Sequence, residues 1–243
     1  MSGRAVAKVA LICLILFGVC RADAPVPGSV PLSRPAGGAG RHGEGAFPKM
    51  ETNRQNMEHF EIEGPGHRFY TAFRELYAAS FPLFEQRTEE QQLRAFAGNR
   101  YRLVGYGTDG AFVGFLSYWE FEDYRYIEHF AISPARRGQG YGGGILRDFV
   151  RSSSKIVLLE IDPVVDAVSG ARLRFYRGCG FYENPYPHRH PPYREGYGAH
   201  PLVVLTTQRE LTGGEYAAFC RDLAGVVMAD GRPAGVVPAP ETE

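Results

Sequence analysis

Residues 134–149, PARRGQGYGGGILRDF, place two arginines directly before five glycines and a helical pattern. Backbone amides without side chains in the way can approach an anion closely, and the N-terminus of a helix adds about half a positive charge. Each glycine in a helix costs about 1 kcal/mol relative to alanine, so a turn that binds nothing is the weaker interpretation. The segment therefore predicts a phosphate-binding turn.

Two common phosphate-binding patterns fit this turn poorly. The P-loop pattern is excluded because no Gly-Lys-Ser/Thr occurs here. The dinucleotide pattern G-x-G-x-x-G is met by Gly138, Gly140 and Gly143, with Glu160 and Asp162 where a ribose-binding acid belongs. However, SPARR separates the first glycine from the preceding strand, which continues an antiparallel meander. A dinucleotide-binding oxidoreductase remains an alternative.

The elements that would position this turn follow from hydrophobic periodicity and turn residues. A short apolar strand, KIVLLEI, follows the glycine-rich helix and is of the kind that is buried on both faces. A helix between two strands implies a parallel pair with a right-handed crossover. Strands are expected at 57–63, 101–107, 111–120, 124–132, 155–161, 180–184 and 201–208, and helices at 68–81, 88–97, 139–152, 169–180 and 211–228.

Helix boundaries can be assigned for two of these helices. Ser169 is the expected N-cap of the helix over 169–180, and Thr212 with Glu215 forms a capping box at the start of 211–228. The predicted fold class is α+β with a mixed sheet, in which an antiparallel meander precedes a parallel βαβ crossover.

Two segments together resemble a known family. RGQGYG (137–142) has the R/Q-x-x-G-x-G/A form, and FYRGCGFYEN (175–184) resembles an "FY…GF" segment. These two segments, together with the order of the expected elements over residues 57–208, resemble the GNAT superfamily of N-acetyltransferases. The resemblance implies an acyltransferase that moves an acetyl group from acetyl-CoA to a primary amine, needs no metal, and has a splayed central strand pair. A catalytically silent CoA-binding module is the alternative.

The resemblance also implies which residues bind the cofactor. Backbone amides of the turn would hold the pyrophosphate, the arginines would add charge, and the preceding strand would pair with the pantetheine arm. The implied CoA-binding residues are Phe130, Ala131, Ile132, Arg136, Arg137, Gly138, Gln139, Gly140, Tyr141 and Gly142.

For catalysis, the resemblance assigns the acid that protonates the leaving thiolate to Tyr176. Glu128 is the first choice of base, because strict alternation puts it on an apolar sheet face, where burial raises a carboxyl pKa. On that alternation it shares a face with Tyr126, Phe130 and Ile132. His129 would point to the other face unless a bulge intervenes. Glu160 and a water chain are the other options.

The loop over 185–200 carries His188, His190 and His200, which could ligate zinc, but no acidic or thiol ligand is spaced to complete a site. We expect no metal here. Instead, the loop should line the acceptor site. Cys179 is expected to be a small buried residue rather than a nucleophile. The expected substrate-site residues are Glu160, His188, His190 and Tyr193.

Composition restricts the remaining function classes. The 243 residues carry a formal net charge of zero, so no nucleic acid and no stable membrane association is expected, and four cysteines do not indicate a disulfide scaffold. The expected acceptor is a small-molecule or peptide amine. Its identity, and whether the protein is a homodimer, stay open.

The chain divides into four expected parts. Residues 1–24 are signal-like, 25–49 form a Pro/Gly-rich disordered linker, 50–228 form the acetyltransferase domain, and 229–243 form a disordered tail. Because acetyl-CoA is cytosolic, we expect a cytoplasmic protein. Export is the alternative if the signal-like segment is genuine. In that case the protein could be a secreted binding protein.

Overall fold

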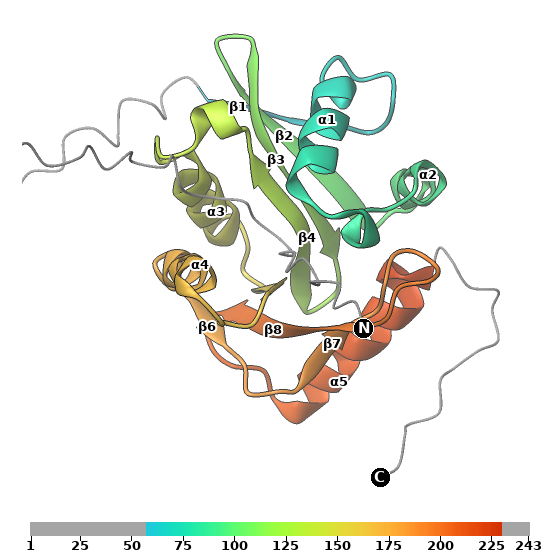
Figure 1. Ribbon diagram of the computed structural model, residues 1–243, viewed down its shortest axis with the longest axis vertical. Helices are drawn as coiled ribbons and strands as arrows, with labels where there is room; N and C mark the ends of the chain where they lie inside the picture. Colours follow the sequence, from blue (N-terminus) through green and yellow to red (C-terminus); the bar gives the residue numbers. More distant parts are fainter. Residues whose placement is uncertain (1–56, 230–243) are drawn as a thin grey trace, which may run out of the picture.

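The computed structural model describes residues 57–229 (Figure 1). The expected signal-like segment (1–24), the linker (25–49) and the tail beyond residue 229 lie outside the described residues. Within residues 57–229, no helix combines the length and apolar character needed to cross a membrane.

The described strands form one mixed sheet in the order β1-β2-β3-β4-β5-β8-β6, with β7 paired to β8. Neighbours are antiparallel except β4 and β5, which are parallel, so the expected meander and crossover are confirmed. The short β7 lies inside the segment expected to be a loop. The strands are β1 (Glu58–Glu61), β2 (Tyr101–Thr108), β3 (Ala111–Glu120), β4 (Tyr124–Ile132), β5 (Ile156–Ile161), β6 (Phe181–Glu183), β7 (His188–His190) and β8 (His200–Thr207).

The helices begin and end close to their predicted bounds. Thr212 and Glu215 form the predicted capping box. The predicted N-cap Ser169 is wrong, because Asp166 caps that helix. Ser169 is the third helical residue and completes a capping box with Asp166. Its hydroxyl oxygen accepts a hydrogen bond from the Asp166 backbone amide. The helices are α1 (Tyr70–Ser80), α2 (Glu89–Ala97), α3 (Tyr141–Arg151), α4 (Ala167–Arg177) and α5 (Gly213–Asp222), followed by a π-helical turn (Leu223–Val227).

The sheet separates two layers of helices. Helices α1 and α2 lie on one side of the meander, and α3 lies on the other side with α4 beside it (Figure 1). Aromatic contacts fix both layers: Phe73 of α1 packs edge-on against Phe115, and Phe149 of α3 packs edge-on against Tyr118. Since residues 115 and 118 have opposite parity along β3, they mark its two faces.

A β-bulge interrupts β4 at its centre. Ser117 pairs with His129, but Tyr118 pairs with Ile127, so Glu128 is an extra residue without a cross-strand partner. Cross-strand partners share a face of the sheet. The expected alternation is therefore wrong beyond this point: Phe130 pairs with Leu116 and takes the α3 face, whereas His129 joins the side chain of Glu128 on the α1 face.

Strands β4 and β5 separate soon after they meet. Their register joins Tyr124, Arg125 and Tyr126 to Ile156, Val157 and Leu158. Within residues 57–229 it contains no further pair, although β4 runs on to Ile132 and β5 to Ile161. The predicted splay of the central strand pair is thus present. It opens towards the glycine-rich turn that follows β4.

Candidate active site

The turn after β4 is built around two glycines with left-handed backbone. A short 3-10 turn (Pro134–Arg136) follows the strand, and α3 begins at Tyr141. Gly138 has φ 73° and Gly140, the N-cap of α3, has φ 82°. Residues with a Cβ atom rarely adopt such angles, so the chain needs glycine at both positions. The first amides of a helix have no carbonyl partner within it, which leaves a row of N–H donors at this turn.

The predicted phosphate-binding side chains have other contacts. The guanidinium Nε of Arg137 donates to the carbonyl of Ile132 at 3.0 Å, and the Gln139 amide donates to the carbonyl of Ala135 at 3.0 Å. Arg136 is half-buried. These bonds tie the turn to the end of β4, so the turn amides and the last residues of β4, Phe130–Ile132, form one continuous segment beside the splay.

Tyr176 lies on α4, on the same side of the sheet as α3. Its side chain is fully buried, and its ring packs edge-on against Phe181 at 5.9 Å. The end of α4 approaches α3 where Arg147 contacts the sulfur of Cys179, which is buried as expected. The assignment of Tyr176 as the acid stays a prediction.

Glu128 is surrounded by donors. Arg87 contacts its Oε1 through Nη2 at 2.7 Å, Trp119 Nε1 donates to Oε2 at 2.8 Å, and the Tyr193 hydroxyl donates to Oε1 at 3.0 Å. Burial by itself raises the pKa of the Glu128 carboxyl, but the Arg87 guanidinium and these donors outweigh it and hold that pKa below its ordinary value. The expected raised pKa of Glu128 is therefore wrong, because its contact with Arg87 could not be predicted from the strand pattern.

Glu160 is held in a second buried network. The Tyr126 hydroxyl donates to its Oε2 at 2.5 Å, and His188 Nε2 contacts Oε1. His188 Nδ1 in turn lies 3.0 Å from the hydroxyl of Tyr216, which donates to the carbonyl of Pro187. Burial opposes charge on His188, yet the Cys220 side chain and the Glu160 carboxylate raise its pKa to about 9. The pair is an ion pair of carboxylate and imidazolium at neutral pH.

The remaining predicted substrate residues also lie inside the protein. His190 is buried and stacks on Tyr193 with ring centroids 5.1 Å apart, and its Nε2 lies 3.8 Å from Glu160. His129, brought to this side by the bulge, lies 5.7 Å from the Tyr193 ring. Burial lowers the pKa of His129 to about 4. The structure thus brings Glu128, His129, Glu160 and the 185–200 segment together on one face, next to the splay.

The sequence reasoning missed Glu85. This residue ends the 3-10 turn Leu83–Glu85 between α1 and α2, and its carbonyl accepts from His129 Nε2 at 3.0 Å. Its side chain is fully buried, and neither carboxyl oxygen has a hydrogen-bond partner among the described residues. Burial raises its pKa to about 9, the Asp162 carboxylate adds to the increase, and Arg172 opposes it. Nothing in LFEQRT indicated that this carboxyl would be buried.

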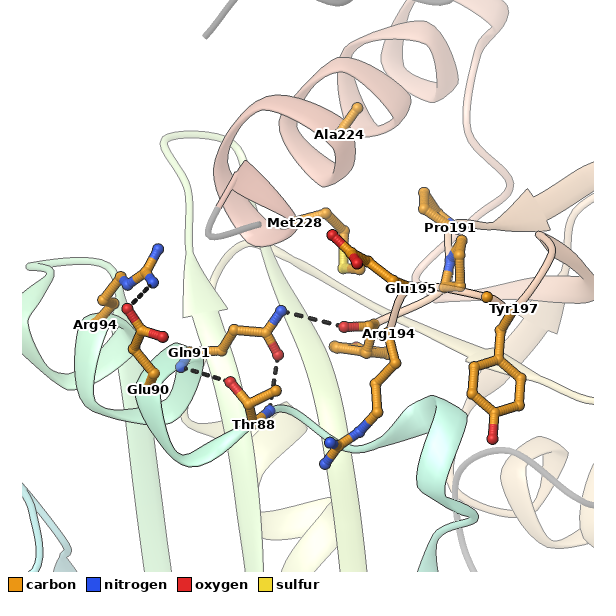
Figure 2. Close-up of a pocket in the computed structure, with 13 residues that line it drawn as sticks. Thr88, Glu90, Gln91, Arg94, Pro191, Arg194, Glu195, Tyr197, Ala224 and Met228 are labelled. Atoms are coloured by element: carbon orange, nitrogen blue, oxygen red, sulfur yellow. Dashed lines mark hydrogen bonds and ion pairs between the residues drawn. The ribbon is translucent and has the colours of Figure 1, made fainter. Parts of the chain in front are cut away.

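A pocket of about 950 Å³ opens on the same face. It lies between the N-terminal turn of α2, the segment 191–197 and the π-helical turn Leu223–Val227 that follows α5 (Figure 2). Gln91 spans its floor, donating to the carbonyl of Tyr193 at 3.1 Å and to the Thr88 cap through its backbone. Glu90, Arg94, Arg194 and Glu195 make its wall polar and charged of both signs. Across residues 57–229, no three His, Cys, Asp or Glu side chains are grouped to hold a metal ion.

Comparison with known proteins places this geometry in a family. Residues 70–181 match the model of the acetyltransferase (GNAT) family. No curated protein matches the chain. A putative GNAT acetyltransferase from Bacteroides thetaiotaomicron is 26% identical with a TM-score of 0.66, over 70% of this chain and 98% of that one.

Two other solved structures are more distant. A GNAT acetyltransferase from Elizabethkingia anophelis with acetyl-CoA bound is 15% identical, with a TM-score of 0.44, over 64% of this chain and 100% of that one. An acetyltransferase from Bacillus subtilis in complex with CoA is 12% identical, with a TM-score of 0.44, over 62% and 97%. The family model, the B. thetaiotaomicron structure and the splayed β4–β5 pair agree: residues 70–181 of this chain form a domain of the acetyltransferase (GNAT) family.

Proposed function

We propose that this protein transfers an acetyl group from acetyl-CoA directly to a primary amine. The observation that carries the proposal is the opening between β4 and β5, which lies next to a turn of left-handed glycines at the N-terminus of α3. An extended pantetheine arm can pair with the edge of β4, and a pyrophosphate can accept from the amides of residues 137–142. No metal takes part in the proposed chemistry.

Within this proposal, Tyr176 protonates the thiolate that leaves. A phenol has an ordinary pKa near 10, so it holds its proton at neutral pH and can donate it to sulfur. A backbone amide near Phe130 or Ala131 stabilises the oxyanion. Glu128 and Glu160 have a structural role: their ion pairs with Arg87 and His188 hold the side chains on the sheet face opposite α3 in place. The body of a small-molecule or peptide amine occupies the pocket of Figure 2. The use of acetyl-CoA favours a cytoplasmic site of action.

The experiment compares thermal stability of the full chain with acetyl-CoA, CoA, NAD and ATP. A ligand present at 100 times its Kd adds about 2.7 kcal/mol to the free energy of unfolding. Acetyl-CoA and CoA are expected to raise Tm, and NAD and ATP are not. A rise with NAD alone would overturn the proposal in favour of a dinucleotide site.

Two matched variants locate the binding site. Gly138 (φ 73°) and Gly196 (φ 82°) are both left-handed, and a Cβ at either would meet no atom within 4 Å. Gly138→Asp and Gly196→Asp therefore carry similar backbone strain, of about 1–2 kcal/mol. Only Gly138→Asp adds a negative charge where the pyrophosphate would lie, so only it should abolish the Tm rise with acetyl-CoA.

A further inference from the structure

Three glutamates are fully buried in the described structure, and they are in different chemical states. Glu128 accepts from Arg87, Trp119 and Tyr193, and Glu160 accepts from Tyr126 and contacts His188. Their donors hold the pKa of both carboxyls below the ordinary value. Glu85 is equally buried, yet it has no donor among residues 57–229.

No cationic side chain among residues 57–229 bonds the Glu85 carboxyl. The charge of Arg172 acts on it, but this guanidinium already bonds Asp162 through Nη1 at 2.5 Å. Arg87, two residues along the chain, is engaged with Glu128. His129 meets Glu85 through the backbone carbonyl and is held neutral by burial. A buried carboxyl without a donor costs free energy, and a leucine would avoid that cost. Such a group is suited to a ligand that brings its own donors.

Glu85 lies near the strands that separate at the splay. The turn that holds Glu85 contacts β4 through His129. Two charges act on its carboxyl: that of Asp162, which follows β5, and that of Arg172, which belongs to α4. Glu85 therefore lies on the α1 face of the sheet, beside β4 and within electrostatic range of the residue that follows β5. The 191–197 segment covers the same turn, because Arg194 Nε donates to the carbonyls of Leu83 at 2.9 Å and Gln86 at 3.2 Å.

We infer that Glu85 receives the acceptor as an alkylammonium ion and is the base that takes its proton. The inference rests on the proposed function and specifies its substrate class: a cationic primary amine rather than an arylamine or an amide. It also moves the base from β4, where Glu128 was expected, to the turn between α1 and α2.

The proton balance of the step is complete. Free Glu85 is protonated at neutral pH and releases that proton to solvent when the ammonium binds. Its carboxylate then takes one proton from the ammonium, and the neutral nitrogen attacks the thioester carbonyl. The N–C bond forms and the C–S bond breaks. Tyr176 gives its proton to the leaving thiolate, and the second proton of the nitrogen returns to the Tyr176 phenolate. The products are the acetamide and CoA thiol, and Glu85 is protonated again.

The first test follows the Glu85 carboxyl directly, without turnover. Protein with ¹³C-labelled glutamate side chains is titrated with pH by NMR, with and without excess n-butylamine, and Glu85→Gln identifies the signal. A Glu85 signal that titrates well above the ordinary carboxyl range, and shifts at least one pH unit lower with n-butylamine, is expected. An ordinary titration, or one that n-butylamine leaves unmoved, would overturn the inference.

The second test measures acetyl transfer by CoA thiol release with a polyamine, a lysine peptide and an aminoglycoside. Glu85→Gln is expected to lower kcat/KM at least 100-fold, Glu85→Asp to keep part of the activity, and both to bind acetyl-CoA like the wild type. Activity of Glu85→Gln within threefold of wild type would contradict the assignment. If the wild type does not bind acetyl-CoA, the proposed function is refuted. The NMR titration would still decide the role of Glu85.

Discussion

Arg87 and Glu128 form an ion pair that is sealed inside the protein: Nη2 lies 2.7 Å from Oε1, with the two side chains 2% and 0% exposed. Arg87 also donates to the carbonyl of Val227, so the pair joins the α1–α2 segment, the bulge of β4 and the end of the last helix. Removal of one member of such a pair leaves a buried charge without a partner.

Arg87→Met is therefore expected to lower the free energy of unfolding by about 3–5 kcal/mol. Urea unfolding followed by circular dichroism measures this change. Arg151→Met, which breaks an exposed α3 ion pair with Asp148, serves as the control and should change it by less than about 1 kcal/mol. Equal effects of the two variants would show that the Glu128 carboxyl does not depend on Arg87. The double variant Arg87→Met/Glu128→Gln should recover part of the loss.

Glu85→Gln is expected to stabilise the protein while it lowers activity. The folded-state pKa of about 9 exceeds the ordinary value of 4.5, so the unfolded chain ionises first, and the free energy of unfolding falls as pH rises between these values. The variant removes this loss, which is about 4 kcal/mol at pH 7.5. Burial of the unpaired glutamine amide costs about 1–3 kcal/mol, so a net gain of about 2 kcal/mol is expected. Tm of wild type and variant from pH 4.5 to 9 measures it. Parallel curves would mean that Glu85 ionises normally in the folded protein.

His188 should give a pH dependence of its own. Its folded-state pKa of about 9 lies above the ordinary 6.5, so its stabilising charge is fully present below pH 6.5 and is lost as pH rises towards 9. His188→Gln is expected to be less stable than wild type at pH 6.5, with the difference shrinking by pH 9.5. Denaturant titrations at both values test this, and His59→Gln, at an exposed position on β1, should show no such change. A difference that is constant with pH would exclude the ion pair with Glu160.

Tyr176→Phe separates the proposed acid from a core residue. Loss of a general acid lowers kcat by about 100-fold or more, whereas the ring contact with Phe181 survives the change. Acetyl-CoA affinity should stay within twofold of wild type. Phe175→Leu, at the neighbouring and partly buried position of the same helix, is the control for altered packing of α4. If both variants lose the same activity, Tyr176 acts through the fold alone.

Local patterns carried most of the fold prediction. Periodicity located each α-helix of residues 57–229 to within a few residues, and the continuous apolar run at β5 with a helix before it predicted the parallel pair. These signals are local, because they depend on which side chains a single helix or strand buries. The glycine turn was visible for the same reason, since a left-handed backbone requires glycine wherever it occurs.

The active-site details depend on contacts between distant segments, and the sequence could not supply them. The bulge at Glu128 is a property of the register between β3 and β4, not of either strand alone. Arg87 is 41 residues from its partner Glu128. The turn that holds Glu85 is bonded by Arg194, which lies more than a hundred residues further along the chain. The Arg87 contact changed the expected ionisation of Glu128, and the cover over Glu85 produced a buried carboxyl that the sequence did not indicate.

Hydrogen exchange of the full chain, with and without acetyl-CoA, shows directly whether the cofactor lies between β4 and β5. Acetyl-CoA held between β4 and β5 is expected to slow amide exchange in residues 128–142, which span the end of β4 and the glycine turn, and to leave the β1–β2 pair unchanged. Slower exchange confined to other segments, or none at saturating acetyl-CoA, would contradict the account.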